Sequence, residues 1–367
     1  MRIHSSPELG ARSRMHCVSR LQRCLGNGIH DLGMLNPQSR EHLVVAAQSL
    51  VVVADLTDVG ERSRVFRSRT RDELTTLRRG PHLPTEVWRE LPREDQHRLR
   101  CLSSSDVLAP GEAISHRSAA LLRGLPLVGG WPTRVETTVL VESGLTSTAA
   151  LRRHRRVERP SVEQLFGLPV TSEAQTVVDV ATSSPFASAV VVADAALWRA
   201  ARARQEIGVR QLHDELDAHV QHLGAARGSA RARRVVDVAD HRADRPGESL
   251  SRVAMIELGA DLPELQYEVV GLSGRHYWVD FGWPELGIVA EFDGKAKYSD
   301  PEFLRGRTAE QAVYDEKLRE DDIRPMVTGF GRWDWTIARS LELMAHRLHA
   351  IGVPMRSRHA TVLLSAM

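Results

Sequence analysis

The chain has 367 residues, 42% of them hydrophobic and 26% charged, which allows two or three folded domains and excludes a chain that is disordered throughout. Its 49 basic residues nearly balance its 47 acidic ones, which excludes a globally basic nucleic-acid coat, so any such binding must come from local patches. The three cysteines, Cys17, Cys24 and Cys101, form neither a disulfide framework nor a paired zinc-ligand pattern.

The segment between residues 1 and 38 has little periodicity, and we expect it to be disordered or to precede the true start of translation. The longest apolar run, Leu43 to Ala54, has 12 residues and is too short to span a bilayer. No apolar segment of signal-peptide length stands at the N-terminus. These observations predict a cytoplasmic protein without a membrane span.

Residues 39–105 are predicted to be mainly helical and rich in arginine, and seven arginines fall between Arg62 and Arg79. The run from Thr70 to Gly80 predicts a helix, because Thr70 can cap it, Glu73 completes a capping box and Gly80 ends it before a proline. A helical unit with an arginine face is typical of a DNA-binding winged helix. A solvated helix face is the alternative, since charge runs alone are weak evidence. The candidate DNA contacts are Arg69, Arg71, Arg78 and Arg79.

Residues 106–245 mix helix and strand. A short helix is predicted from Ser115 to Gly124, a strand over 135–141, and buried helices over 176–181 and 187–202. The basic run 152–156 meets phosphates or is a solvated edge, and both interpretations stay open. His116 and His154 have no neighbours at metal-ligand spacing and are predicted to be structural.

A third domain is expected over residues 246–350, followed by a tail over 351–367. The segment 246–259 predicts a helix that begins after a proline and stops at a glycine, with Glu248 in its first turn. Strands are predicted over 276–283 and 288–293, and the loop between them, Pro-Glu-Leu-Gly, is a hairpin connection.

That loop sets the register of the hairpin: Trp283 faces Ile288, so Asp280 faces Glu291, and Asp293 shares their face. The alternation predicts that the opposite face is wholly apolar and packs on a core. It is built from Tyr277, Val279, Phe281, Ile288, Ala290 and Phe292.

Like charges facing each other in a strand pair are destabilising, so these acids require a shared proton, a basic partner or a metal. Carboxylate oxygens suit Mg²⁺ or Mn²⁺. The nearby Lys295 and Lys297 suit charge stabilisation at a metal-bound phosphate. The alternative is a carboxylate pair that these lysines or Arg275 neutralise. Likewise, Glu248 is either part of the acid cluster or an N-terminal helix residue that pairs with the arginine four positions later.

The segment VDFGWPELGIVAEFDGKAKY at 279–298 resembles a domain related to the very-short-patch-repair endonucleases, a group of the PD-(D/E)xK nuclease superfamily. The resemblance extends to GESLSR at 247–252, EKLRED at 316–321 and GFGRWDW at 329–335. It implies a C-terminal α/β/α restriction-endonuclease-like fold with a mixed sheet, within a mixed α/β, multidomain chain.

The same resemblance implies a metal-dependent hydrolysis of DNA phosphodiesters, in defence or DNA repair. Asp280, Glu291 and the carbonyl of Phe292 would hold Mg²⁺ or Mn²⁺, with Glu248 nearby. Asp293 stands where the superfamily often has lysine, so Lys295 or Lys297 would supply the positive charge. The more distant Arg319 and Arg332 are expected to bind phosphates or carboxylates, or to form structural salt bridges.

The front half, with ISHRSAA at 114–120 and Gly-Leu-Pro at 124–126, resembles actinobacterial proteins related to AbiEi-type antitoxins. That resemblance implies a winged-helix-like domain before an antitoxin-like domain, and a cognate toxin or defence partner. Two hypotheses follow. The first is a DNA nuclease; the second is a non-catalytic DNA-binding regulator of antitoxin type with a degenerate nuclease fold.

Overall fold

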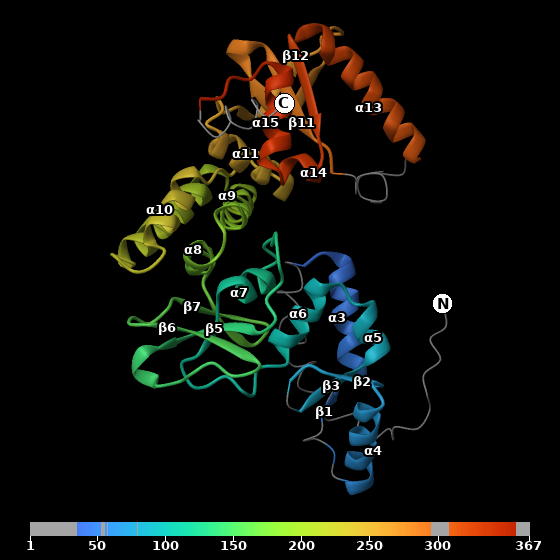
Figure 1. Ribbon diagram of the computed structural model, residues 1–367, viewed down its shortest axis with the longest axis vertical. Helices are drawn as coiled ribbons and strands as arrows, with labels where there is room; N and C mark the ends of the chain where they lie inside the picture. Colours follow the sequence, from blue (N-terminus) through green and yellow to red (C-terminus); the bar gives the residue numbers. More distant parts are fainter. Residues whose placement is uncertain (1–34, 53–55, 57, 79, 295–307, 357–367) are drawn as a thin grey trace. The chain divides into compact units, whose positions relative to one another are not determined.

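A computed structural model describes residues 35–52, 56, 58–78, 80–294 and 308–356 of the chain (Figure 1). The chain forms two compact units: unit 1 comprises Met1–Ser183 and Ala218–Ser229, and unit 2 comprises Ser184–Asp217 and Ala230–Met367. Helices and mixed sheets in both units confirm the predicted mixed α/β, multidomain class. Unit 2 includes helices upstream of residue 246 as well as the predicted third domain.

Among the described residues, the N-terminal part of unit 1 joins four helices to a small antiparallel sheet with the strand order β1-β3-β2. The first helix begins at a proline after Asn36, whose side chain accepts a hydrogen bond from the backbone N–H of Ser39. The elements are α3 (Pro37–Ser49), β1 (Val51–Val52), α4 (Val59–Thr70), β2 (Leu74–Thr76), β3 (Pro81–Pro84), α5 (Thr85–Glu90) and α6 (Arg93–Leu102).

The helix predicted over residues 70–80 is not formed. Thr70 ends α4 and its hydroxyl donates to the carbonyl of Phe66 within that helix, so it caps no new one. Asp72 then adopts a left-handed backbone conformation with φ of 59°, and the chain turns into β2. The β-branched pair Thr75 and Thr76 fits the strand that pairs with β3, which overrides the local capping pattern.

A second sheet in unit 1 has five strands in the order β6-β5-β4-β8-β7. The predicted strand at 135–141 is confirmed as β5, and the predicted helices at 115–124 and 176–181 are confirmed as α7 and α8, which pack against each other. The elements are β4 (Ala113–Ile114), α7 (His116–Leu122), β5 (Val135–Leu140), β6 (Leu151–Arg156), β7 (Val162–Leu165), β8 (Leu168–Thr171) and α8 (Glu173–Ser183).

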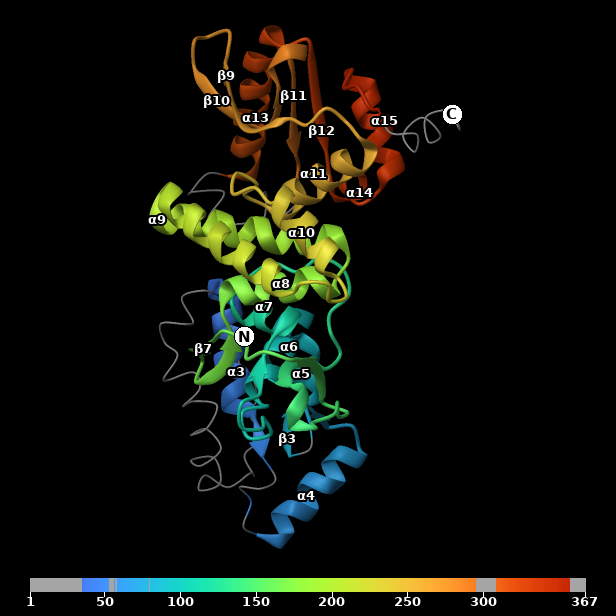
Figure 2. The ribbon, with the colours of Figure 1, turned by 90° about the vertical axis from the view of Figure 1, so that its left-hand side faces the viewer.

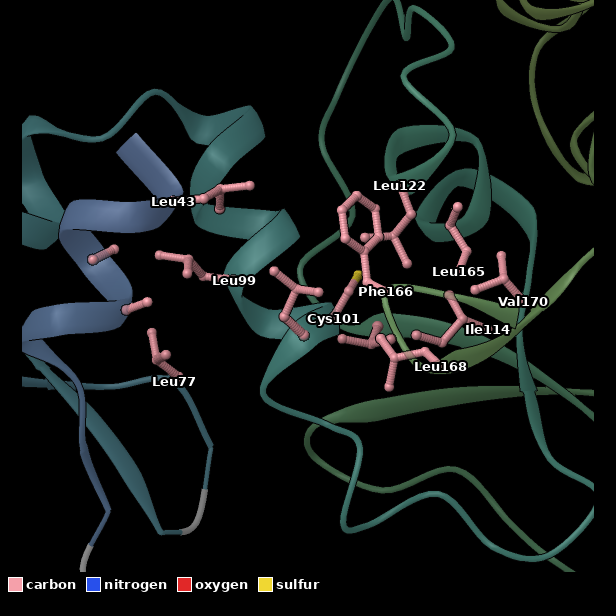
Figure 3. Packing of buried hydrophobic residues seen from close by; sticks show 14 of the residues in the cluster. Leu43, Leu77, Leu99, Cys101, Ile114, Leu122, Leu165, Phe166, Leu168 and Val170 are labelled. Atoms are coloured by element: carbon pink, nitrogen blue, oxygen red, sulfur yellow. The ribbon is translucent and has the colours of Figure 1, made fainter. Parts of the chain in front are cut away.

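One buried cluster runs through both parts of unit 1 (Figure 3). It joins Leu43 of α3 and Leu99 of α6 to Ile114, Leu122 and Phe166 around the five-stranded sheet. Cys101 lies inside this cluster with no exposed surface and is a free thiol. The small helical part and the five-stranded sheet therefore share one core.

Two helices follow α8. The first, α9 (Phe186–His222), contains the region predicted to be helical at 187–202 and breaks at Arg204 and Gln205, which have non-helical backbone angles. Its last residues, from Ala218 on, belong to unit 1, and the rest belongs to unit 2. The second is α10 (Ser229–Val238).

The C-terminal part of unit 2 is a four-stranded mixed sheet in the order β12-β11-β10-β9. The first three strands along the chain form an antiparallel meander, and β12 is parallel to β11, a connection made by the crossover helix α13. The elements are α11 (Pro246–Leu258), β9 (Glu264–Val270), β10 (His276–Trp283), β11 (Ile288–Phe292), α13 (Ala309–Ile323), β12 (Gly329–Trp333), α14 (Trp335–Ala338) and α15 (Leu341–Ile351). Figure 2 shows α13 on one side of the sheet and α11, α14 and α15 on the other.

The predicted hairpin and its register are confirmed. Trp283 pairs with Ile288 and Phe281 with Ala290, and Gly287 closes the loop in the left-handed conformation with φ of 64°. The helix predicted over 246–259 is confirmed as α11, which ends at Gly259 with φ of 61°.

The prediction of a single apolar face on this hairpin is wrong. Phe281 stacks on Trp333 with ring centroids 5.3 Å apart, on the side of α11. Val279, two residues earlier, lies in a different cluster with Val289 and Ile323 of α13. The strand therefore changes face at Asp280. The physical reason is that helices cover both faces of this sheet, so each face needs its own apolar residues.

Candidate functional site

Glu248 stands in the first turn of α11 and is held against the end of β11. The helix begins at Pro246, which has a fixed φ suited to the first helical position. Gly247 is required there because a Cβ atom at this position would come within 2.1 Å of the Phe292 ring. The side chain of Ser251, one turn later, accepts a hydrogen bond of 2.8 Å from the indole of Trp333. These contacts bury Glu248 to 3% exposure.

Asp280 lies at the point where β10 changes face. Its Oδ2 accepts a hydrogen bond of 2.7 Å from the backbone N–H of Phe292, which bridges β10 to the end of β11. The charge of Asp280 also acts on the carboxyl of Glu248. The structure thus brings two of the predicted site residues together, on the side of the sheet that α11 covers.

The pKa of Glu248 is raised to about 8, first by burial and then by the negative charges of Asp280 and Asp244. One oxygen of Glu248 accepts hydrogen bonds from the backbone N–H of Asp244 at 3.1 Å and from the side-chain amide of Gln266 at 3.4 Å. At neutral pH this pair of acids therefore favours either one bound proton or a nearby positive charge.

Arg252 is not the partner of Glu248, contrary to the alternative in which the two pair across one helical turn. The guanidinium of Arg252 instead binds both oxygens of Asp194 at 2.8 Å, and Asp194 has no exposed surface. This contact ties α11 to α9. Of the two predicted alternatives for Glu248, the structure therefore favours membership of the acid cluster.

Glu291, the other predicted metal ligand, is held by two arginines on the side of the sheet that α13 covers. Arg319 of α13 forms an ion pair with one of its oxygens, and Arg332 of β12 binds the other at 2.9 Å. Arg332 also lies 3.1 Å from Glu316 and 3.4 Å from Glu320. Both arginines thus bind carboxylates, as one of the predicted alternatives had it, and among the described residues they, rather than Arg275, are the ionic partners of Glu291.

Asp293 follows β11, and its backbone N–H extends the ladder by donating to the carbonyl of Trp333 at 2.7 Å. Its Oδ1 is buried and has no hydrogen-bond partner among the described residues. Lys295 and Lys297 lie outside the described residues, so their predicted roles are not addressed by the structure.

The donors at this site suit a hard divalent cation such as Mg²⁺ or Mn²⁺, because Glu248, Asp280 and Asp293 all offer carboxylate oxygens. The orphaned Oδ1 of Asp293 and the raised pKa of Glu248 both indicate a site that favours added positive charge. Within the described ranges, however, no three histidine, cysteine, aspartate or glutamate side chains are gathered closely enough to hold a metal. The carboxylates fit the ion chemically, although the complete ligand set is not assembled.

The arginines predicted to contact DNA in unit 1 have different environments. Arg69 and Arg71 are exposed at the end of α4, and Arg71 lies 4.0 Å from Glu73. Arg78 is turned inward, where it donates to the carbonyl of Ser103 and pairs with Asp106. Arg79 lies outside the described residues.

The basic run at 152–156 forms strand β6, and three of its four arginines lie beside internal carboxylates. Arg153 binds buried Glu112 at 2.8 Å, and Arg156 binds buried Asp179 at 2.8 Å. Arg152 lies 3.5 Å from Glu136. These contacts favour the structural interpretation of the run over the phosphate-binding one.

His116 and His154, which the sequence predicts to be structural, lie side by side in unit 1. Their rings stack with centroids 3.6 Å apart, and His116 has a left-handed φ of 53° at the start of α7. Burial lowers the pKa of His116 well below its ordinary value, and burial raises the pKa of Asp179 to about 6. Burial therefore keeps the His116 imidazole neutral inside unit 1 at neutral pH.

Sequence reasoning missed Gln266 and Asp194 at this site. Neither stands in a recognisable motif, and each comes close to α11 only because the chain folds back on itself. Gly282 is the one local indication of the irregular strand, because a Cβ atom there would come within 2.3 Å of the Tyr267 ring.

No helix in the part of the chain that the structure describes is long and apolar enough to cross a membrane. No protein-family model matches the chain. Two proteins of Mycobacterium tuberculosis are similar to it: uncharacterized protein Rv2248 of strain H37Rv and uncharacterized protein MT2308 of strain CDC 1551. Each is 31% identical to the chain over 211 residues, which cover 56% of the chain and 72% of the relative.

Proposed function

This chain belongs to the family of the two mycobacterial proteins, and we propose that it is a metal-dependent nuclease that hydrolyses DNA phosphodiesters at the site formed by Glu248 and Asp280. The observation that carries the proposal is the negative charge of Asp280 acting on the buried carboxyl of Glu248 in unit 2, which helps to raise the pKa of Glu248. Repulsion between two such carboxylates is unfavourable for folding, and a divalent cation offsets that repulsion.

The order of the elements supports the same assignment. A helix carries the first acid, a three-stranded meander carries the second, and a crossover helix leads to a fourth, parallel strand. We propose that this α-β-β-β-α-β arrangement is the restriction-endonuclease-like fold of the PD-(D/E)xK superfamily. A fold alone does not establish an activity, so the proposal depends mainly on Glu248 and Asp280.

Glu248 and Asp280 would hold Mg²⁺ or Mn²⁺, with Asp293 as a third oxygen donor and the carbonyl of Phe292 as a further ligand. When bound, such an ion lowers the pKa of a coordinated water and offsets negative charge on the scissile phosphate. Glu291, on the α13 side of the sheet, would join these ligands only if Arg319 and Arg332 released it and its carboxylate reached the α11 side. Either Lys295 or Lys297 supplies the remaining positive charge toward the phosphate.

The test is a calorimetric titration of the full chain with Mn²⁺, beside Asp280→Ala and a matched control, Asp321→Ala. Asp321 is an exposed acid on α13. We expect saturable binding in the wild type and the control, and its loss in Asp280→Ala. Absence of binding to folded wild-type protein would refute the nuclease assignment.

A second measurement addresses catalysis. Glu291→Ala should abolish Mn²⁺-dependent cleavage of DNA and leave DNA affinity largely intact, because phosphate contacts dominate affinity. Cleavage that survives this substitution would remove Glu291 from the catalytic set.

A second candidate function is that of a DNA-binding regulator of antitoxin type without catalysis, in which the nuclease-like domain is a binding platform. The observation that favours it is the pair of arginines on Glu291, which neutralise an acid that a nuclease requires. The β1-β3-β2 sheet next to arginine-rich α4 supports it further, because this is the arrangement we expect of a winged helix. This candidate predicts DNA binding that is independent of Mn²⁺, and a cognate toxin or defence partner.

A further inference from the structure

Gln266 has an unusual backbone conformation for its place in the middle of β9. Its φ is 51°, in the left-handed region, where a side chain other than that of glycine brings Cβ too close to the following carbonyl oxygen. Neither a turn nor a helix end explains it, since β9 continues to Val270 on one side and begins at Glu264 on the other. Strained residues of this kind persist where the surrounding structure holds them, and they are common at functional sites.

The strain coincides with the change of face in the sheet. Tyr267 pairs with Val279 and Leu265 pairs with Phe281, which leaves Gln266 opposite Asp280 with no ladder pair between them. Tyr267 packs with Val279 on the α13 side. Phe281 packs on the α11 side, so both strands change face at the same level of the sheet. Gln266 and Asp280 are the two residues at the change.

The side chain of Gln266 is directed at the other acid of the site. Its amide Nε2 donates to Oε2 of Glu248 over 3.4 Å, and the backbone N–H of Asp244 donates to the same oxygen over 3.1 Å. Two donors on one oxygen restrict the rotation of the Glu248 carboxylate, so its second oxygen points away from both donors. Gln266 therefore contacts Glu248 with its side chain while its backbone faces Asp280.

We propose that Gln266 is a positioning residue of the metal site. Its left-handed backbone turns the amide toward Glu248, and the amide fixes one carboxylate oxygen, so that the other would be available, together with Asp280, to a bound cation. This inference rests on the proposed nuclease function. The competing explanation is purely structural: the irregular strand at Gln266 would serve only to seat Tyr267 over Gly282, where a Cβ atom would come within 2.3 Å of the ring.

Two substitutions separate the backbone from the side chain. Gln266→Gly removes the strain and the amide together, because glycine adopts the left-handed conformation freely. Gln266→Asn keeps an amide and tolerates the same backbone conformation, but it is one methylene too short to reach Glu248. Asp72→Gly is the matched control for strain relief, because Asp72 in unit 1 also has a left-handed φ, of 59°.

The readouts are the melting temperature of the full chain and its Mn²⁺ dissociation constant by calorimetry. For Gln266→Gly we expect an unchanged or higher melting temperature together with a dissociation constant raised about tenfold, which corresponds to the loss of one hydrogen bond to a charged group. Gln266→Asn should show the same weakening at an unchanged melting temperature. Asp72→Gly should leave Mn²⁺ binding as in the wild type.

The outcomes distinguish this inference from the proposed function. Wild-type protein that binds Mn²⁺ while both Gln266 variants bind it equally well would overturn the positioning role and leave the nuclease proposal standing. A lower melting temperature in Gln266→Gly with unchanged Mn²⁺ affinity would establish the structural explanation instead. Folded wild-type protein that binds no Mn²⁺ would refute both. Should the glycine variant fail to fold, the affinity of Gln266→Asn decides.

Discussion

The two arginines on Glu291 give the sharpest test of whether this acid serves a metal or only the fold. We consider Arg319→Ala. In the structure the Arg319 guanidinium pairs with Glu291, whose side chain is 10% exposed, and donates to the carbonyl of Trp278. If Glu291 is a latent metal ligand, a cation must compete with Arg319 for its oxygens, so removing Arg319 should strengthen metal binding.

The size of the effect follows from the contact that is lost. A hydrogen bond to a charged group stabilises by about 1.5–3 kcal/mol, and each 1.4 kcal/mol is roughly tenfold in affinity. Because Arg332 still holds the other oxygen at 2.9 Å, we take the lower end and expect Mn²⁺ to bind about tenfold more tightly. Since the contact to Trp278 is lost as well, the melting temperature should fall by roughly 2–4 °C for each kcal/mol lost.

Calorimetry with Mn²⁺ measures the first effect, and a thermal melt followed by circular dichroism measures the second. Arg324→Ala is the matched control: it removes an arginine at the C-terminal end of α13 that pairs with Glu320, and its contacts do not include Glu291. The control should bind Mn²⁺ as the wild type does. Equal or weaker Mn²⁺ binding by Arg319→Ala would refute the reasoning and would assign Glu291 to the fold.

Three further predictions concern stability and DNA binding. Burial lowers the pKa of His97 to about 4. Between that pKa and the pKa of about 6.5 that His97 has in the unfolded chain, only the unfolded chain takes up the proton. The free energy of unfolding of unit 1 should therefore fall by about 3 kcal/mol as the pH falls from about 6.5 to 4. Urea melts across that range should show a flatter dependence in His97→Gln. Asp194→Ala leaves the buried guanidinium of Arg252 unpaired and should destabilise unit 2 by about 3–5 kcal/mol, whereas replacing both residues with apolar ones should cost less; equal losses in the two variants would contradict this. Replacing exposed Arg69 and Arg71 with alanine should reduce the salt dependence of DNA affinity, and an unchanged slope would remove the end of α4 from the DNA-binding surface.

Local patterns predicted the elements around the site well. Pro246 at the first helical position and Gly259 after the last one mark α11, and the structure has its ends at those residues. The loop Pro284–Gly287 predicted the hairpin and its register, because a short turn leaves only one way to pair the strands. Local patterns failed at 70–80, where the sequence has the pattern of a capping box but pairing with β3 decided the conformation.

The acids at the site were predictable as residue types, but their partners were not. Asp280 and Glu291 were expected to form one cluster because a regular strand would place them on one face. In the structure Asp280 acts on Glu248, while Glu291 is bound by residues 28 and 41 positions later in the chain. The change of face at Asp280 places Asp280 and Glu291 on different sides of the sheet. The regular alternation of polar and apolar residues in the sequence does not predict this change.

By itself, the sequence determined where α11 and the hairpin begin and end and which carboxylates they carry, because capping, turns and alternation act over a few neighbouring residues. Tertiary structure decided which groups face those carboxylates. It paired Arg252 with Asp194, 58 positions away, and it brought Gln266 to Glu248, where β9 and β10 change face while they stay paired. Contacts between residues so far apart in the chain depend on how the helices and strands pack together, and a local sequence pattern does not predict that packing.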